Sequence, residues 1–143
     1  MSPGSKKAVV RRFYEEVFNE GKVQLLPELV SEDYTEVWDG ERHEVGLEGA
    51  KQHALGVRQT YPDLRLSIDR QIAEGDWVVS CVTASGTHLG EWMGMAPTGK
   101  SVTFTGVNVD RVVEGKIVEH GGAANMLGPL LEIGAVRVVG PAG

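Results

Sequence analysis

The spacing of apolar residues changes near residue 64, and this change limits the possible folds more than any other feature of the chain. Upstream, apolar residues recur at helical spacing, as Val9, Phe13 and Val17 do. Downstream, apolar and polar residues alternate, as in the stretch 64–69, which is typical of half-buried strands. Helices followed by a meander of long strands predict an α+β domain, with the helices packed on one side of a curved antiparallel sheet.

The first half of the chain predicts three helical segments. The first lies within residues 5–22, with Ser5 as its N-cap and Gly21 as its C-terminal stop. A shorter one follows within 23–29, and a third lies within 46–63. Strands are expected at 34–38, 64–72, 76–88, 101–112 and 116–120, and a broken helix, interrupted at Pro129, at 124–136.

Length and charge narrow the class of protein. A chain of 143 residues is a common size for one domain, and we expect a single domain over 1–143 with its core at 6–135 and flexible tails at 1–5 and 136–143. The net charge of -6 argues against a nucleic-acid partner. No apolar stretch approaches the roughly 18 residues of a membrane span, and no secretory signal is visible, so we expect no membrane association and a cytoplasmic location.

The last hairpin carries most of the polar chemistry, and its register depends on the turn. A three-residue turn at 113–115, with glycine at the left-handed position, would pair Asn108 with His120 and Asp110 with Val118. We prefer it to a two-residue turn at 114–115, which would pair Asp110 with Glu119. In the preferred register one face carries Phe104, Gly106, Asn108, Asp110, Val118, His120 and Gly122, and the other carries Val107, Val109 and Ile117. The first face is either the solvated side of the sheet or the floor of a pocket beneath the helices.

Five short motifs in order give the chain a resemblance to a known family. They are RRFYEEVFNEGK at 11–22, EDY at 32–34, GTHLGE at 86–91, PTGK at 97–100 and GKIVEH at 115–120. Together they resemble the SnoaL-like polyketide cyclase family of the nuclear transport factor 2-like superfamily. The resemblance implies a cone-shaped α+β barrel with a deep apolar pocket, a dimer or higher homo-oligomer such as a tetramer, an aromatic or polyketide-type ligand, and no metal or organic cofactor.

The resemblance fails at one important position. The family's cyclases place their acid/base aspartate two residues after the histidine that matches His120, where this chain has Gly122. Gly121 stands where many relatives have a bulky residue. The polar positions that help the cyclases match Asn108 and Glu36 here. The cyclase carboxylate is therefore missing, which puts the usual aldol mechanism in question.

The expected function follows from the fold and from this loss. We expect a cofactor-independent enzyme of polyketide or secondary metabolism that acts on a polycyclic intermediate by general acid/base chemistry. Isomerisation, hydration, epoxide opening and a hydroxylation step are favoured over aldol closure. The alternative is a non-catalytic small-molecule-binding protein that kept the pocket, and a weaker third reading is a dimerisation module.

The candidate catalytic residues are the polar groups that the pattern places near one another. Asp110 and Glu36 are the candidate general bases, while Asn108 and His120 would hold a substrate oxygen. Glu36 alternates with aromatic residues such as Trp38, so it is expected to be either partly buried or at a pocket mouth, and burial would raise the pKa of its carboxyl group. The plainer interpretations are a solvated aspartate at a strand end and an exposed glutamate on an edge strand.

The remaining candidates are residues for substrate contact. They are Tyr14, Trp38, His53, His88, Trp92, Met93 and Phe104. Trp92 and Met93 lie in a glycine-rich loop that either caps the pocket or anchors itself or an oligomer contact, and His88 alternatively braces that loop. The four histidines lack the spacing of metal ligands, so no metal site is expected.

Overall fold

The computed structural model describes residues 2–141, and it confirms the α+β class. In chain order the elements are α1 (Pro3–Arg12), the π-helical segment η1 (Phe13–Asn19), the 3₁₀ turn η2 (Val23–Leu25), α2 (Leu26–Leu29), β1 (Val30–Trp38), β2 (Glu41–Glu44), α3 (Gly46–Thr60), β3 (Arg65–Glu74), β4 (Trp77–Thr87), β5 (Ser101–Val113), β6 (Lys116–Ala124) and α4 (Leu127–Glu132). Residues 1 and 142–143, parts of the two expected tails, lie outside the described residues.

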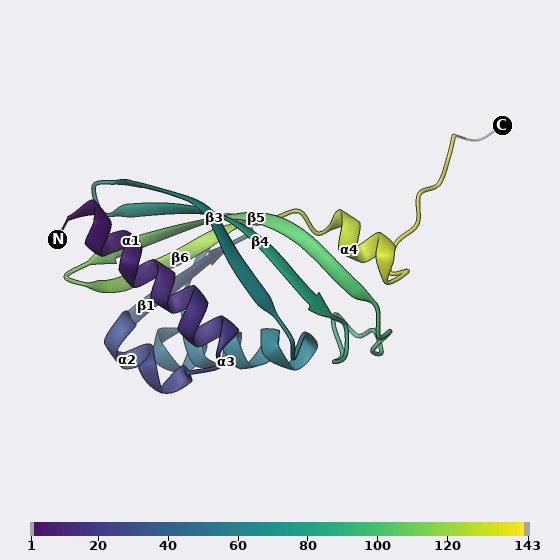
Figure 1. Cartoon of the computed structure of the whole chain (residues 1–143), viewed down its shortest axis with the longest axis horizontal. Helices are drawn as coiled ribbons and strands as arrows, with labels where there is room; N and C mark the ends of the chain where they lie inside the picture. Colours follow the sequence, from purple (N-terminus) through teal and green to yellow (C-terminus); the bar gives the residue numbers. More distant parts are fainter. Residues whose placement is uncertain (1, 142–143) are drawn as a thin grey trace.

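The strands form a six-stranded mixed sheet in the order β2-β1-β6-β5-β4-β3. All neighbours are antiparallel except β1 and β6, which run parallel. The sheet is curved but does not close into a barrel, and α1, α2 and α3 cover one of its faces (Figure 1). Helix α4 lies at the far end of the long β4–β5 strands, away from the other helices (Figure 1). The hollow side of the sheet therefore faces the helices.

The first helix begins earlier than the sequence pattern predicts. The hydroxyl of Ser2, not Ser5, is the N-cap, and it accepts a hydrogen bond from the amide of Ser5 at 3.0 Å. Pro3 occupies the first helical position, where its missing N–H costs nothing. The helix then widens into η1 and ends as predicted at Gly21, whose φ of 73° suits glycine. The predicted tail 1–5 thus contains the first residues of α1.

The predicted hairpin register is wrong, although most of the predicted face is right. Glu114 and Gly115 both have positive φ, 49° and 80°, and form a two-residue turn that pairs Val112 with Ile117. A β-bulge at Val118 then shifts β6 by one residue, so that Asp110 pairs with His120 and Asn108 with Gly122. The shorter turn pairs Ile117 with Val112 and so places Ile117 on the inner face, opposite the predicted one, where it is fully buried.

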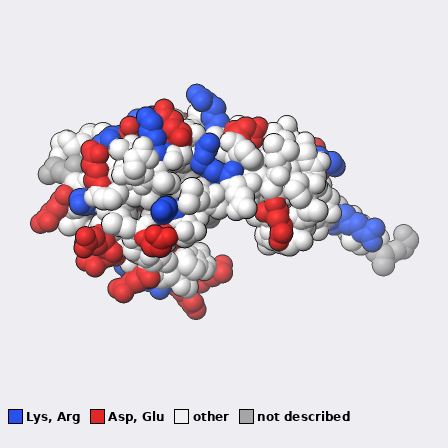
Figure 2. Space-filling model, turned by 90° about the horizontal axis from the view of Figure 1, so that it is seen from below, with Lys and Arg blue, Asp and Glu red and all other residues white. Residues whose placement is uncertain are grey.

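The core fills the space between the helices and the inner face of the sheet. Its fully buried side chains include Val10, Phe13, Val17, Leu29 and Val112. Figure 2 shows acidic side chains gathered over the part that carries the helices, with Lys and Arg scattered among them.

Contrary to our prediction, Pro129 does not interrupt the last helix. It is the third residue of α4, where the backbone N–H has no partner within the helix, so proline costs no hydrogen bond there. Among the helices of residues 2–141, none has the length and apolar character needed to cross a membrane.

Candidate active site

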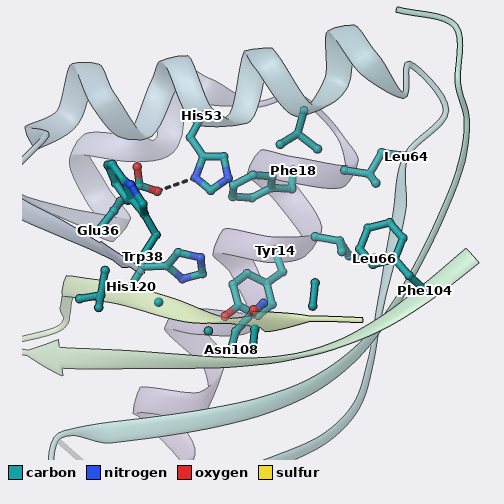
Figure 3. Close-up of a pocket in the computed structure, with 16 residues that line it drawn as sticks. Tyr14, Phe18, Glu36, Trp38, His53, Leu64, Leu66, Phe104, Asn108 and His120 are labelled. Atoms are coloured by element: carbon teal, nitrogen blue, oxygen red, sulfur yellow. Dashed lines mark hydrogen bonds and ion pairs between the residues drawn. The ribbon is translucent and has the colours of Figure 1, made fainter. Parts of the chain in front are cut away.

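A pocket of about 490 Å³ opens between helices η1 and α3 and the inner face of β1, β5 and β6. Its walls are mostly apolar, and its polar groups are Tyr14, Glu36, His53, Asn108 and His120. Figure 3 shows that His53 projects from α3 toward His120, and that Tyr14 and Asn108 lie beside His120 on the floor of the pocket. The polar face predicted from β5 and β6 therefore lines a pocket and is not the solvated side of the sheet.

Asp110 lies behind the pocket wall and does not line the pocket. It is 0% exposed, and each of its oxygens has a partner. Oδ1 lies 2.6 Å from Nδ1 of His120, and Oδ2 accepts a hydrogen bond from the hydroxyl of Tyr14. A carboxylate so enclosed is well placed to orient its partners, and His120 rather than Asp110 faces the substrate space.

The surroundings of Asp110 shift the pKa of both of its partners upward. Burial alone would lower the pKa of His120, but the charge of Asp110, the hydrogen bond to it and the charge of Glu36 outweigh burial and raise that pKa above its ordinary value. Burial, followed by the charge of Asp110, raises the pKa of Tyr14 well above its ordinary value. His120 thus favours the imidazolium form, and Tyr14 stays a neutral donor.

Glu36 forms a second carboxylate–imidazole pair with His53. Its Oε2 lies 2.5 Å from Nδ1 of His53 and accepts a hydrogen bond from the hydroxyl of Tyr34 at 3.2 Å. Glu36 is 9% exposed, and β1 is an inner strand of the sheet, so the reading as an exposed edge-strand glutamate is wrong. Burial acts to raise the pKa of Glu36, as predicted, but His53, His120 and Tyr34 together outweigh burial and lower that pKa below its ordinary value.

The two imidazoles face the same space. The parallel pairing of β1 and β6 sets Glu36 beside His120, and the ring centroids of His53 and His120 lie 6.1 Å apart. Phe18 packs edge-on against His53, as Phe13 and Tyr14 do against His120. Nδ1 of each ring is held by a carboxylate, and among the described residues no hydrogen bond reaches either Nε2. Each ring therefore offers Nε2 for chemistry in the pocket.

Gly122 lines the pocket, and the backbone here has no room for a side chain. A Cβ atom at Gly122 would lie 2.3 Å from the carbonyl oxygen of Val107 and 2.8 Å from Oδ1 of Asn108. Its φ of 153° is also one that residues other than glycine rarely adopt. The local backbone thus excludes a carboxylate side chain at this position.

The structure brings together most of the predicted site residues. Tyr14, Trp38, His53, Phe104, Asn108 and Glu36 line the pocket with His120. Trp38 stacks on His43 with 3.5 Å between ring centroids and is 46% exposed, so it stands at the edge of the pocket.

Three predicted substrate contacts lie elsewhere. His88 is 0% exposed and braces the loop through a 3.0 Å contact between its Nδ1 and the hydroxyl of Thr98. Trp92 packs near Tyr61 and His88, outside the residues that line the pocket, and Met93 is 75% exposed. This arrangement matches the alternative in which His88 braces the loop.

Several site residues were not predicted from the sequence. Leu64 and Leu66 supply apolar wall from the start of β3, and Tyr34 supports Glu36. The alternation of 64–69 marked the leucines as buried but did not show what they face. Within residues 2–141, no cluster of three or more His, Cys, Asp or Glu side chains is arranged to hold a metal ion.

The sequence profile of the SnoaL-like polyketide cyclase family matches residues 8–133. Among curated proteins, the chain is 30% identical over 117 residues to the aklanonic acid methyl ester cyclase AcmA of Streptomyces galilaeus, covering 79% of each chain. It is 29% identical over 119 residues to the nogalonic acid methyl ester cyclase of Streptomyces nogalater, covering 82% of this chain and 89% of that one.

Solved structures agree with these sequence matches. AclR, a putative hydroxylase from Streptomyces galilaeus, superposes with a TM-score of 0.84 at 29% identity, covering 97% of this chain and 87% of AclR. A putative SnoaL-like polyketide cyclase from Jannaschia sp. CCS1 superposes with a TM-score of 0.85 at 21% identity, covering 96% of this chain and 98% of that one, and this similarity bears on the fold alone.

Proposed function

The chain belongs to the SnoaL-like polyketide cyclase family, and we propose that it catalyses enolisation and ring closure of a polycyclic, polyketide-type substrate without a cofactor. The observation that carries this proposal is the mostly apolar pocket whose floor presents His120 held by the buried carboxylate of Asp110. An apolar cavity with a few convergent polar groups suits a flat aromatic ligand with a reactive carbonyl.

The polar floor supplies what enolisation requires at the carbonyl oxygen. Removing a proton from carbon next to a carbonyl places negative charge on that oxygen, so donors aimed at it lower the barrier. His120 as imidazolium and the amide of Asn108 are such donors, and both line the pocket. Asp110 positions His120 and balances its charge from behind, and Tyr14 in turn holds Asp110 by a hydrogen bond.

We expect the purified protein to convert the substrate of one of the similar cyclases, aklanonic acid methyl ester or nogalonic acid methyl ester, into a ring-closed isomer of unchanged mass. Liquid chromatography with absorbance and mass detection measures this conversion. His120→Gln should lower kcat roughly 100-fold or more, because loss of a positioned proton donor typically costs that much. Lys116→Ala is the matched control, since this exposed residue begins the same strand.

Two outcomes would contradict this function. A His120→Gln variant that folds and keeps wild-type kcat would remove His120 from the mechanism. Tight binding of both methyl esters, each recovered unchanged after long incubation, would favour the non-catalytic binding protein instead. Isothermal titration calorimetry measures that binding directly.

We also propose that the protein forms a homodimer through the outer face of the sheet, as the family resemblance implies. Ile72, Trp77 and Val107 on that face are 56%, 40% and 45% exposed, and a second copy would bury such apolar side chains. Sedimentation equilibrium should give twice the chain mass, and Val107→Lys should shift the protein toward monomer. A wild-type protein that sediments as a monomer at every concentration tested would contradict the dimer.

A further inference from the structure

We propose that His53 is the catalytic base that takes the proton from the substrate carbon, and that Glu36 is its positioning residue. This inference rests on the proposed enolisation and adds the group that replaces the absent cyclase carboxylate. It moves the role of base from the carboxylates that the sequence suggested to an imidazole on helix α3.

Neither candidate carboxylate is as well suited as His53 to act as the base. Asp110 does not line the pocket, and its two oxygens are occupied by His120 and Tyr14. Glu36 does line the pocket, but its Oε2 serves both His53 and Tyr34. A carboxylate that accepts hydrogen bonds from such partners is stabilised as an anion, so it is a weaker base than an imidazole beside it.

The hydrogen bond of His53 decides which of its nitrogens is basic. A carboxylate accepts protons in hydrogen bonds, so the contact with Glu36 at 2.5 Å places the His53 proton on Nδ1. The lone pair of the neutral ring is then on Nε2. His53 lines the pocket and its side chain is 36% exposed, so this nitrogen is accessible to a bound substrate.

The two imidazoles are suited to opposite roles. Asp110 is completely buried, and a buried carboxylate needs a charged partner, which keeps His120 protonated. A second imidazolium with its centroid only 6.1 Å away would be repelled by the first. The groups that face this pair are Glu36, Asp110 and Tyr14. The charge on His120 balances that of Asp110, while Glu36, which lines the pocket, is stabilised by hydrogen bonds from His53 and from the hydroxyl of Tyr34.

Protons and electrons are conserved over one cycle of the proposed reaction. Nε2 of His53 takes the proton as the substrate C–H bond breaks, the electron pair forms the enol C=C bond, and the carbonyl oxygen takes a proton from His120. The enol carbon then forms a C–C bond to a second carbonyl carbon, whose oxygen takes the proton from His53. The enol O–H proton returns to His120 as the first C=O bond reforms. Both rings regain their starting states, and no oxidant or cofactor is consumed.

The first experiment needs no substrate. The protein labelled with ¹⁵N in histidine is examined by long-range ¹H–¹⁵N correlation NMR at neutral pH, with His53→Gln and His120→Gln assigning the signals. We expect His120 to carry protons on both nitrogens and His53 to carry one, on Nδ1. In Glu36→Gln, His53 should become a mixture of tautomers. A His53 ring that is protonated on Nε2 in the wild-type protein would overturn the proposal.

The second experiment separates the two proton-transfer steps in deuterated buffer, with the methyl ester that the wild-type protein converts. We expect His53→Gln to lower kcat roughly 100-fold or more, with KM changed little, and to abolish deuterium incorporation at the substrate carbon. Glu36→Gln should show a smaller loss of kcat. Gln52→Ala, one residue away on the outer side of α3, should behave as wild type. Wild-type kcat in a folded His53→Gln variant would overturn the assignment.

The two experiments distinguish a failure of the proposed function from a failure of the assignment of His53 as the base. If neither methyl ester is converted but the tautomers are as expected, the proposed substrate class is wrong and the state of His53 stands. If a methyl ester is converted and His53→Gln still incorporates deuterium at the wild-type rate, the proposed function stands and His53 is not the base.

Discussion

Asp110→Asn should lower kcat by roughly two to four orders of magnitude, although Asp110 does not line the pocket. The amide group would offer His120 a donor or a weaker acceptor in place of the carboxylate, so the ring would lose its charge and its preferred tautomer. In serine protease triads the same change of a positioning aspartate costs about 10⁴ in kcat for this reason. Steady-state kinetics on the converted methyl ester measures the effect, and KM should change far less.

The same variant should change how stability depends on pH. The folded-state pKa of His120 is raised above its ordinary 6.5, so its contribution is fully present below pH 6.5 and is lost as pH rises through the folded pKa. Glu36, whose pKa is lowered from 4.5, contributes above pH 4.5 and less as pH falls. Urea unfolding at a series of pH values should show both trends, with the first one absent in Asp110→Asn. An unchanged alkaline trend in the variant would contradict the pairing.

Gly122→Ala should cost more than about 2 kcal/mol of folding free energy, because its Cβ would meet backbone atoms of β5 and its φ of 153° would be strained. Gly122→Asp should be at least as costly, so it should not place a carboxylate in the pocket at this position. Urea or thermal unfolding followed by circular dichroism measures both variants.

Gly56→Ala on α3 is the matched control for this prediction. No atom lies within 4 Å of the Cβ that it would add, and alanine is the better helix former, so this variant should be more stable by about 0.5–1 kcal/mol. The same chemical change is thus expected to act in opposite directions at two glycines. A Gly122→Ala variant as stable as wild type would show that β6 can readjust and that the glycine is not required.

The order of the other helices and strands was predictable because each carries its own periodicity, but β2 was not predicted, since its residues follow a turn signal and do not alternate between apolar and polar. The change of spacing near residue 64 identified β3 and β4, and Gly21 correctly marked the end of the first helical stretch. The N-cap was misplaced because Ser2 and Ser5 both precede the apolar repeat, and only the backbone geometry distinguishes them. Periodicity also gave no sign that β1 would pair with β6 rather than lie at an edge.

The register of the β5–β6 hairpin was predicted wrongly from the sequence pattern, yet the polar face of the hairpin was predicted correctly. The shorter turn and the bulge at Val118 each shift the pairing by one residue in the same direction, and a shift of two residues leaves the side chains beyond the bulge on the predicted face. A bulge has no signature in an alternating sequence, because its extra residue looks like any other strand residue. The face that carries Asn108, Asp110 and His120 was therefore predicted correctly from a wrong register.

The sequence could not show which site residue is a base and which one positions another group, and the reason here is different. Tyr14 reaches Asp110 across 96 positions in the chain, and His53 reaches Glu36 from a separate helix. Burial and hydrogen-bond partners decide whether a carboxylate acts as a base or orients another group. Those partners depend on packing, and the sequence alone marked only that the groups shared a face.

The parallel pairing of β1 with β6 has a consequence for how the protein is made. Glu36 and His120 are neighbours in the sheet, yet 84 peptide positions separate them (120 − 36 = 84). On a growing polypeptide, β1 can pair only with β2 until the last strand emerges from the ribosome. Pairs so distant in the sequence are the slow ones to form in folding. A chain that has not yet reached β6 lacks His120 and the floor that β6 contributes, so it has no complete pocket.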